Sequence, residues 1–232
     1  MTVFGNRPML DPYDLAILIA IQREIAAGPD AYLTKTDPLT KDDLVLIGSL
    51  IQTYNYADLN ARLIIDNLRH AAEGPQAQNA GVIQDAQVYE KLIEAAKLLP
   101  DTADMRRDLI KAASTFQMHQ QHRHHFAHWA TRRIRGHDAL FMMTYKAQES
   151  KKRLGKPSEP NETTYAVMAL APLLAEMEKL EGHSKWLASE AARVFVNFDD
   201  FQKHFDDEKA ANKATKYQDG MTKKGAKGPA KN

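Results

Sequence analysis

Residues 41–74 read KDDLVLIGSLIQTYNYADLNARLIIDNLRHAAEG, and this stretch decides the fold class. Its apolar residues recur at spacings of three, four and seven, which is the pattern of one buried face of an α-helix. They are Leu44, Ile47, Ile51, Tyr54, Ala61, Ile65 and Leu68. Thr40 and Asp43 resemble a capping box before this run, and Gly74 followed by Pro75 ends it. The sequence therefore predicts one long helix here.

Four other segments carry helical patterns, with proline, glycine or acidic residues at their ends. They cover 12–27, 85–99, 101–135 and 172–198. The connection 29–40 is rich in helix-breaking residues and is predicted to be a loop. ALFMMTYK at 139–146 and TYAVMALA at 164–171 are dense in bulky and β-favouring residues, which predicts a small hairpin, with a helix in either segment as the other interpretation. The predicted fold class is mainly α.

The length suits one sizeable globular domain or at most two small ones, and the composition is that of a globular protein. The chain has 232 residues, of which 44% are hydrophobic and 26% are charged. Apolar residues nearly vanish after His204, and the last eleven residues, TKKGAKGPAKN, hold four lysines and no acidic residue. We therefore predict one helical domain over 1–204 and a disordered basic tail over 205–232.

Composition also limits the chemistry. The chain has no cysteine, which excludes disulfides, thiolate metal sites and cysteine nucleophiles. The longest apolar run, Leu15 to Ile21, is far shorter than the roughly 20 residues of a membrane span. No secretory pattern stands near the N-terminus, so we expect a cytoplasmic protein that makes no membrane contact. The net charge of +1 means that any basic surface must be local.

Residues 117–138, QMHQQHRHHFAHWATRRIRGHD, concentrate basic groups in one segment. They hold six of the nine histidines and four arginines, and no carboxylate occurs before Asp138. A solvated helix face normally carries both signs of charge, and a core helix carries more aliphatic residues. Groups that titrate near neutrality therefore stand beside groups that bind phosphate.

Within this segment, RHHFAH resembles the signature of the HEPN superfamily of small helical proteins. Arg123, His124, Ala127 and His128 match its arginine, polar residue, alanine and histidine, whereas Trp129 replaces a residue that is often small. The resemblance covers about residues 40–138. It implies a HEPN-like bundle with long antiparallel helices and, as in many members, a metal-independent ribonuclease that acts as a toxin or in phage defence. It also implies RNA as substrate, a homodimer with composite sites, a possible antitoxin-type protein partner and no cofactor.

The chemistry of the residues fits RNA cleavage independently of the family name. Cleavage without a metal needs an acid and a base, and positive charge on the phosphorane. Imidazole, with a pKa of about 6.5, supplies the first two near neutrality, and a guanidinium supplies the third. Helical positions five apart point about 140° away from each other, so Arg123 and His128 would converge across a two-fold dimer. The predicted catalytic residues are Arg123, His128 and His124.

Other polar residues are predicted to assist this site. Arg132, Arg133 and Arg135 follow the motif and are candidate contacts to the RNA backbone, with a solvated charged face as the other interpretation. Asn55 and Asp58 are polar residues in an apolar part of the second helix, and either could face the motif helix and orient an imidazole. An intrahelical pair of Asp58 with Arg62 is the simpler interpretation.

Three alternatives stay open. His124 or His125 could share a helical face with His128 and hold Zn²⁺ or Ni²⁺, but a nearby carboxylate ligand is lacking, so no metal site is predicted. Arg123 and His128 could form a hydrogen-bonded pair that only orders a dimer. The chain could also be a non-catalytic module that binds RNA, a nucleotide or a protein, an interpretation that the Trp129 departure keeps open.

Overall fold

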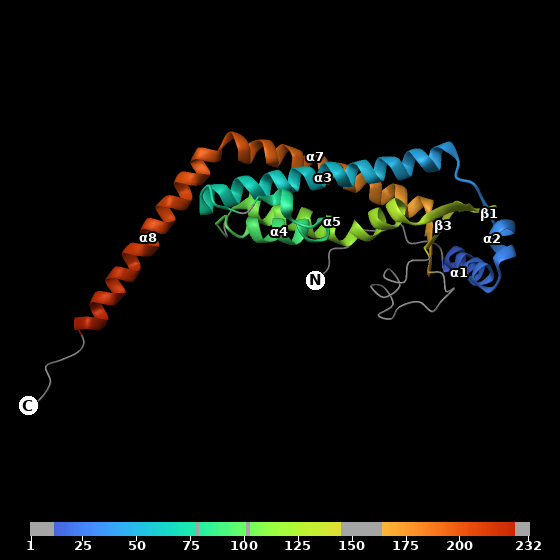
Figure 1. The fold of residues 1–232 in the computed structure, drawn as a ribbon, viewed down its shortest axis with the longest axis horizontal. Coiled ribbons are helices and arrows are strands. Elements are labelled where there is room, and N and C mark those ends of the chain that lie inside the picture. Colours follow the sequence, from blue (N-terminus) through green and yellow to red (C-terminus); the bar gives the residue numbers. More distant parts are fainter. Residues whose placement is uncertain (1–11, 78, 101–102, 145–163, 226–232) are drawn as a thin grey trace, which may run out of the picture. The chain divides into compact units, whose positions relative to one another are not determined.

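A computed structural model of the chain describes residues 12–77, 79–100, 103–144 and 164–225 (Figure 1). It divides into two compact units, the first made of Met1–Ala57 with Thr115–Trp186 and the second of Asp58–Ser114 with Leu187–Asn232. The α-helices are α1 (Pro12–Ala27), α2 (Pro29–Lys35), α3 (Lys41–Glu73), α4 (Val88–Ala96), α5 (Asp104–His128), α7 (Leu170–Val196) and α8 (Phe198–Gly225), with 3₁₀ turns η1 (Ala80–Val82) and η2 (Asp85–Gln87). The predicted mainly α class is confirmed.

The four strands belong to the first unit and form one antiparallel sheet in the order β1-β2-β3-β4. They are β1 (Thr36–Asp37), β2 (Ala130–Ile134), β3 (Ala139–Thr144) and β4 (Thr164–Ala169). The predicted hairpin is confirmed, because β3 pairs with β4 in a register that sets Phe141 opposite Val167. Its connection, 145–163, lies outside the described residues.

The prediction of one helix over 101–135 is wrong at its C-terminal end. Helix α5 stops at His128, and residues 130–134 form strand β2. Gly136, which directly follows the predicted helix, has φ of 75° in the turn between β2 and β3, where the His137 N–H donates to the Ile134 carbonyl. A positive φ favours glycine, so Gly136 permits the turn that pairs β2 with β3.

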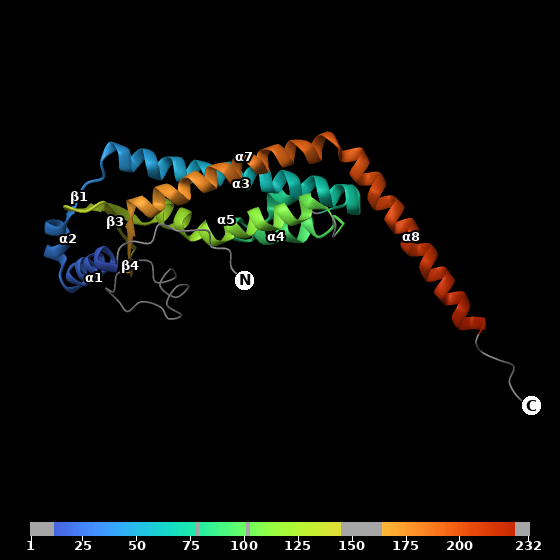
Figure 2. The ribbon, with the colours of Figure 1, turned by 180° about the vertical axis from the view of Figure 1, so that it is seen from behind.

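One hydrophobic cluster of the first unit lies between helix α1 and the sheet. Leu18 and Ile25 of α1 are buried together with Ile134, Phe141 and Ala169. Helix α1 packs against β4, and Figures 1 and 2 both show it beside the sheet. The described helix α2 replaces the predicted loop at its start, over residues 29–35.

The long helix α3 has the ends that the sequence predicts. The Thr40 hydroxyl accepts from the Asp43 N–H, and the Asp43 carboxylate accepts from the Thr40 N–H at 2.9 Å and from its hydroxyl at 2.7 Å. This is the reciprocal pattern of a capping box. At the other end Gly74 has φ of 89°, and its N–H donates to the His70 carbonyl, which is a glycine C-cap.

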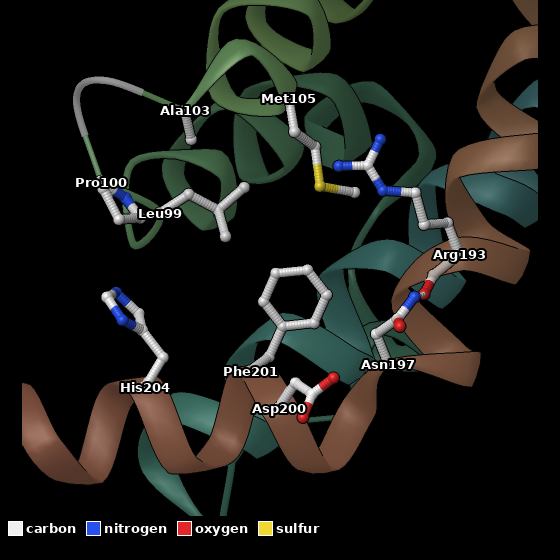
Figure 3. Close-up of a pocket in the computed structure, with 9 residues that line it drawn as sticks. All are labelled: Leu99, Pro100, Ala103, Met105, Arg193, Asn197, Asp200, Phe201 and His204. Carbon is white, nitrogen blue, oxygen red and sulfur yellow. Dashed lines mark hydrogen bonds between the residues drawn. The ribbon is translucent and has the colours of Figure 1, made fainter.

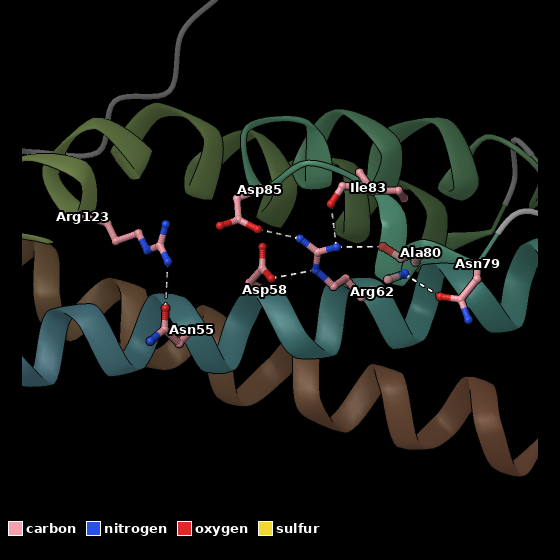
Figure 4. Close-up of polar contacts among 9 residues, drawn as sticks. Asn55, Asp58, Arg62, Asn79, Ala80, Ile83, Asp85 and Arg123 are labelled. Carbon is pink, nitrogen blue, oxygen red and sulfur yellow. Dashed lines mark hydrogen bonds and ion pairs between the residues drawn. The ribbon is translucent and has the colours of Figure 1, made fainter. Parts of the chain in front are cut away.

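In the second unit, Arg62 fastens the segment after α3 (Figure 4). Its guanidinium donates to the backbone carbonyls of Ala80 and Ile83, at 2.7 and 2.8 Å. It also pairs with the carboxylates of Asp58 at 2.8 Å and Asp85 at 2.9 Å. The side chain is only 16% exposed, so one guanidinium satisfies polar groups of the 80–85 segment that would otherwise be costly to bury.

Helix α8 differs from the predicted disordered tail. The chain is helical as far as Gly225, although every side chain described from Asp206 to Thr215 is exposed. This part of α8 is rich in alanine and lysine, which have high helix propensity. Low apolar content therefore agrees with the exposure of these side chains, but it does not prevent the segment from forming a helix. Residues 226–232 lie outside the described part of the chain.

Candidate active site at the end of helix α5

The motif arginine lies in the first unit and contacts helix α3. The Arg123 Nη2 donates a hydrogen bond to the Asn55 Oδ1 at 3.1 Å (Figure 4). The sequence predicts that Asn55 or Asp58 faces the motif helix and orients an imidazole, and the structure places Asn55 against the guanidinium instead. The contact orients the guanidinium, a planar group whose geometry matches that of phosphate oxygens.

The motif histidine His128 ends helix α5 and is exposed. Its ring lies against the ring of His124, one turn earlier, with centroids 4.7 Å apart and planes inclined by 55°. His124 is half-buried. His124 therefore limits the positions of the His128 ring and leaves that ring open to solvent.

The neighbouring histidine and the tryptophan have a structural role. His125 is 8% exposed and Trp129 is 6% exposed, and their rings meet nearly at right angles with centroids 4.4 Å apart. Trp129 therefore fills, with a core side chain, the position where a small residue is common in the resembled family. His125 is thus buried with it, whereas His124 is half-buried and His128 is exposed.

Arg123 and His128 are not brought together within one chain. Arg123 is directed to Asn55 and His128 to His124, and within the described part of the chain no hydrogen bond or ring contact joins Arg123 to His128. This divergence agrees with the angle of about 140° between helical positions five apart. One copy of the chain therefore presents the two groups separately.

The three arginines assigned to RNA contacts have partners inside the first unit. The Arg132 Nε donates to the Thr36 hydroxyl at 2.8 Å, Arg133 pairs with Asp43 and Asp138, and Arg135 pairs with Asp37 at 2.7 Å. These contacts tie β2 to β1 and to the start of α3. The charges of Arg133 and Arg135 are thus balanced by carboxylates, which weakens the predicted RNA-backbone role of these two residues.

The carboxyls of Asp37 and Asp43, which pair with Arg135 and Arg133, both have lowered pKa values. The Arg135 hydrogen bond lowers the pKa of Asp37 below its ordinary value of 3.8, and Asp37 in turn raises the pKa of Arg135. Burial opposes ionisation of Asp43, but the hydrogen bonds from Thr40 and the charge of Arg133 outweigh it and lower the pKa of Asp43 below 3.8.

Because the pKa values of Asp37 and Asp43 are lowered, we expect the first unit to lose stability at acidic pH. A carboxyl whose folded pKa is lowered stabilises the fold fully above its unfolded pKa, and this contribution is lost as the pH falls through the folded value. The free energy of unfolding, measured with urea, should therefore fall below about pH 4. An Asp43→Asn variant should be less stable at pH 7 and should lose less stability on acidification. Equal losses in both proteins would show that Asp43 does not contribute.

The other predicted site residues are placed as follows. Asp58 forms the intrahelical pair with Arg62, so the simpler interpretation of Asp58 is confirmed. Among the described residues, no group of three or more histidine, aspartate or glutamate side chains could hold a metal ion. In the same part of the chain, no helix combines the length and apolar character needed to cross a membrane. The carboxylates of Asp37 and Asp43 were not predicted as arginine partners, since more than 90 residues separate β1 from β2 in sequence.

Comparison of the chain with protein-family models, curated proteins and solved structures finds no match. The end of α5, with Arg123, His124 and His128, is therefore interpreted from its geometry and chemistry.

Proposed function

We propose that the chain is a metal-independent endoribonuclease that acts as a homodimer. Each active site combines Arg123 of one subunit with His128 of the other. The observation that carries this proposal is the divergence of the two side chains on α5. Arg123 is held toward Asn55, and His128 stands exposed at the helix end, so a second copy is needed to bring the guanidinium and the imidazole to one phosphate.

The reaction is a transesterification. The imidazole of His128 removes the proton of a ribose 2′-hydroxyl, the 2′-oxygen forms a bond to phosphorus, and the bond from phosphorus to the 5′-oxygen breaks. The leaving 5′-oxygen takes up a proton, and the imidazole of His128 or a water supplies it. The products are a 2′,3′-cyclic phosphate and a 5′-hydroxyl, and no metal ion enters this balance.

The guanidinium of Arg123 stabilises the phosphorane. Negative charge grows on the non-bridging oxygens during the reaction, and a fixed cation lowers the barrier most when it is already oriented. The hydrogen bond to Asn55 supplies that orientation. His124 limits the motion of the His128 ring through their ring contact and is assigned a supporting role.

The test uses purified protein, structured and single-stranded RNA, and an excess of EDTA. Cleavage should persist with EDTA, should leave 2′,3′-cyclic phosphate ends, and should disappear in Arg123→Ala and His128→Ala. Binding without cleavage would contradict the proposal and would favour the RNA-binding module. Loss of cleavage with EDTA would contradict the metal-independent chemistry.

A further inference from the structure

A pocket of about 410 Å³ lies in the second unit, and no residue of the proposed active site lines it (Figure 3). One wall comes from Leu99, Pro100 and Ala103, which follow α4, and from Met105 at the start of α5. The other comes from the end of α7 and the start of α8, on either side of Asn197. The lining residues are Leu99, Pro100, Ala103, Met105, Arg193, Asn197, Asp200, Phe201 and His204. Its volume is within the range of small-molecule sites, about 300 to 1,000 Å³.

The middle of the pocket is apolar and holds an aromatic ring. Figure 3 shows the Phe201 ring standing between the two walls, with the side chains of Leu99 and Met105 facing it. Leu99 and Met105 are buried in the unit, whereas Phe201 is only half-buried. A planar ring placed here would cover the exposed part of Phe201, and aromatic pairs gain energy beyond the area that they bury.

The backbone at the helix junction keeps this wall in place. The Asn197 N–H and side-chain amide both donate to the Arg193 carbonyl, at 3.1 and 2.8 Å. The Phe201 N–H donates to the Asn197 carbonyl at 3.1 Å. These bonds satisfy polar groups at the end of α7 and the start of α8, so the position of Phe201 relative to Arg193 is defined by the main chain.

The polar end of the pocket suits an anion. Arg193 contacts Glu190 through Nη1 alone, at 3.4 and 3.5 Å, which is longer than the 2.7 to 2.9 Å typical of charge-assisted hydrogen bonds. Among the described residues Glu190 is the only partner of this guanidinium. Figure 3 shows the Arg193 guanidinium directed toward Met105, while the Asp200 carboxylate lies beyond the base of Phe201. An anionic oxygen at the Arg193 end would therefore meet the N–H donors that the long contact to Glu190 leaves unused, and it would stand apart from the Asp200 carboxylate.

We propose that this pocket binds a planar, mainly apolar small molecule that carries one anionic group, with its ring against Phe201 and its anion on Arg193. Neither the ribonuclease activity nor a dimer is required for this site. The apolar contacts provide most of the buried area, and Arg193 provides the selection for negative charge.

The test compares two fluorescent probes with one ring system. 8-Anilinonaphthalene-1-sulfonate carries the anion, and N-phenyl-1-naphthylamine lacks it. The wild-type chain should bind the sulfonate at a single saturable site. Its affinity for the sulfonate should be about tenfold higher than for the neutral probe, because the sulfonate gains one charge-assisted contact with Arg193. Arg193→Gln should remove this preference and leave the affinity for the neutral probe nearly unchanged.

A second variant tests the place of binding without altering a charge. Ala103→Phe should fill the pocket and abolish binding of both probes, whereas Ala86→Phe, a matched change at an exposed residue of η2 outside the pocket, should bind as the wild type does. Circular dichroism and urea unfolding confirm that each variant is folded. Equal affinity of the wild type for the two probes, or equal binding by Ala103→Phe and Ala86→Phe, would overturn the proposal.

Discussion

Replacing His128 with alanine is expected to lower the rate of RNA cleavage by about 10² to 10⁴-fold, the usual contribution of a positioned acid or base. The ring is exposed and contacts His124, so its removal should cost little stability. The rate is measured under single-turnover conditions, where product release does not contribute. His124→Ala should have a smaller effect, because the reacting imidazole remains and loses only a neighbour that limits its motion.

The matched control is His137→Ala. His137 belongs to the same histidine-rich stretch but lies in the turn between β2 and β3, so its removal should leave the cleavage rate within about twofold of wild type. A His128→Ala variant that cleaves as fast as His137→Ala would show that the imidazole at the end of α5 is not catalytic.

Arg62→Ala should have the largest effect on the stability of the second unit, a loss of about 3 to 5 kcal/mol in the free energy of unfolding. The loss has two sources. The carbonyls of Ala80 and Ile83 lose a charged donor, and the carboxylates of Asp58 and Asp85 lose their cation. Arg62→Lys should recover only part of this loss, because one ammonium cannot reach four acceptors arranged for a planar fork.

Arg107→Ala is the control for this change. Arg107 belongs to the same unit and also pairs with two carboxylates, those of Asp104 and Asp108, but its side chain is 70% exposed. Exposed ion pairs contribute about 0 to 1 kcal/mol, so urea unfolding should detect little change. If Arg62→Ala is as stable as Arg107→Ala, the contacts of Arg62 with the 80–85 segment do not contribute to the free energy of unfolding.

Local patterns in the sequence predict the elements that they encode directly. Helix α3 follows from periodic apolar residues and from Thr40 and Asp43 at its start, and the β3–β4 hairpin follows from two runs of β-favouring residues. Strand β2 was predicted as helix because its residues, ATRRI, have no clear period of their own. Its conformation depends on pairing with β3 and β1, and such tertiary pairing overrides local propensity.

The residues of the candidate site that lie close together in sequence were predictable in the same way. Arg123, His124 and His128 form a local motif, and Asn55 is conspicuous as a polar residue in an apolar stretch. The partners of Arg133 and Arg135 were not predictable, because Asp43 and Asp37 lie 90 or more residues away in sequence and meet these arginines only in the folded chain. The pocket at Arg193 and Phe201 also depends on long-range packing, which periodicity does not encode.

The most direct test of the composite site mixes two inactive proteins, Arg123→Ala and His128→Ala, under conditions that allow subunits to exchange. In a mixed dimer one site carries both substitutions and the other carries none. With equal amounts and free exchange, half of the dimers are mixed, so about one quarter of the wild-type cleavage activity should return. If each site is built within one chain, a mixed dimer holds no intact site, and cleavage would stay at the level of the separate variants.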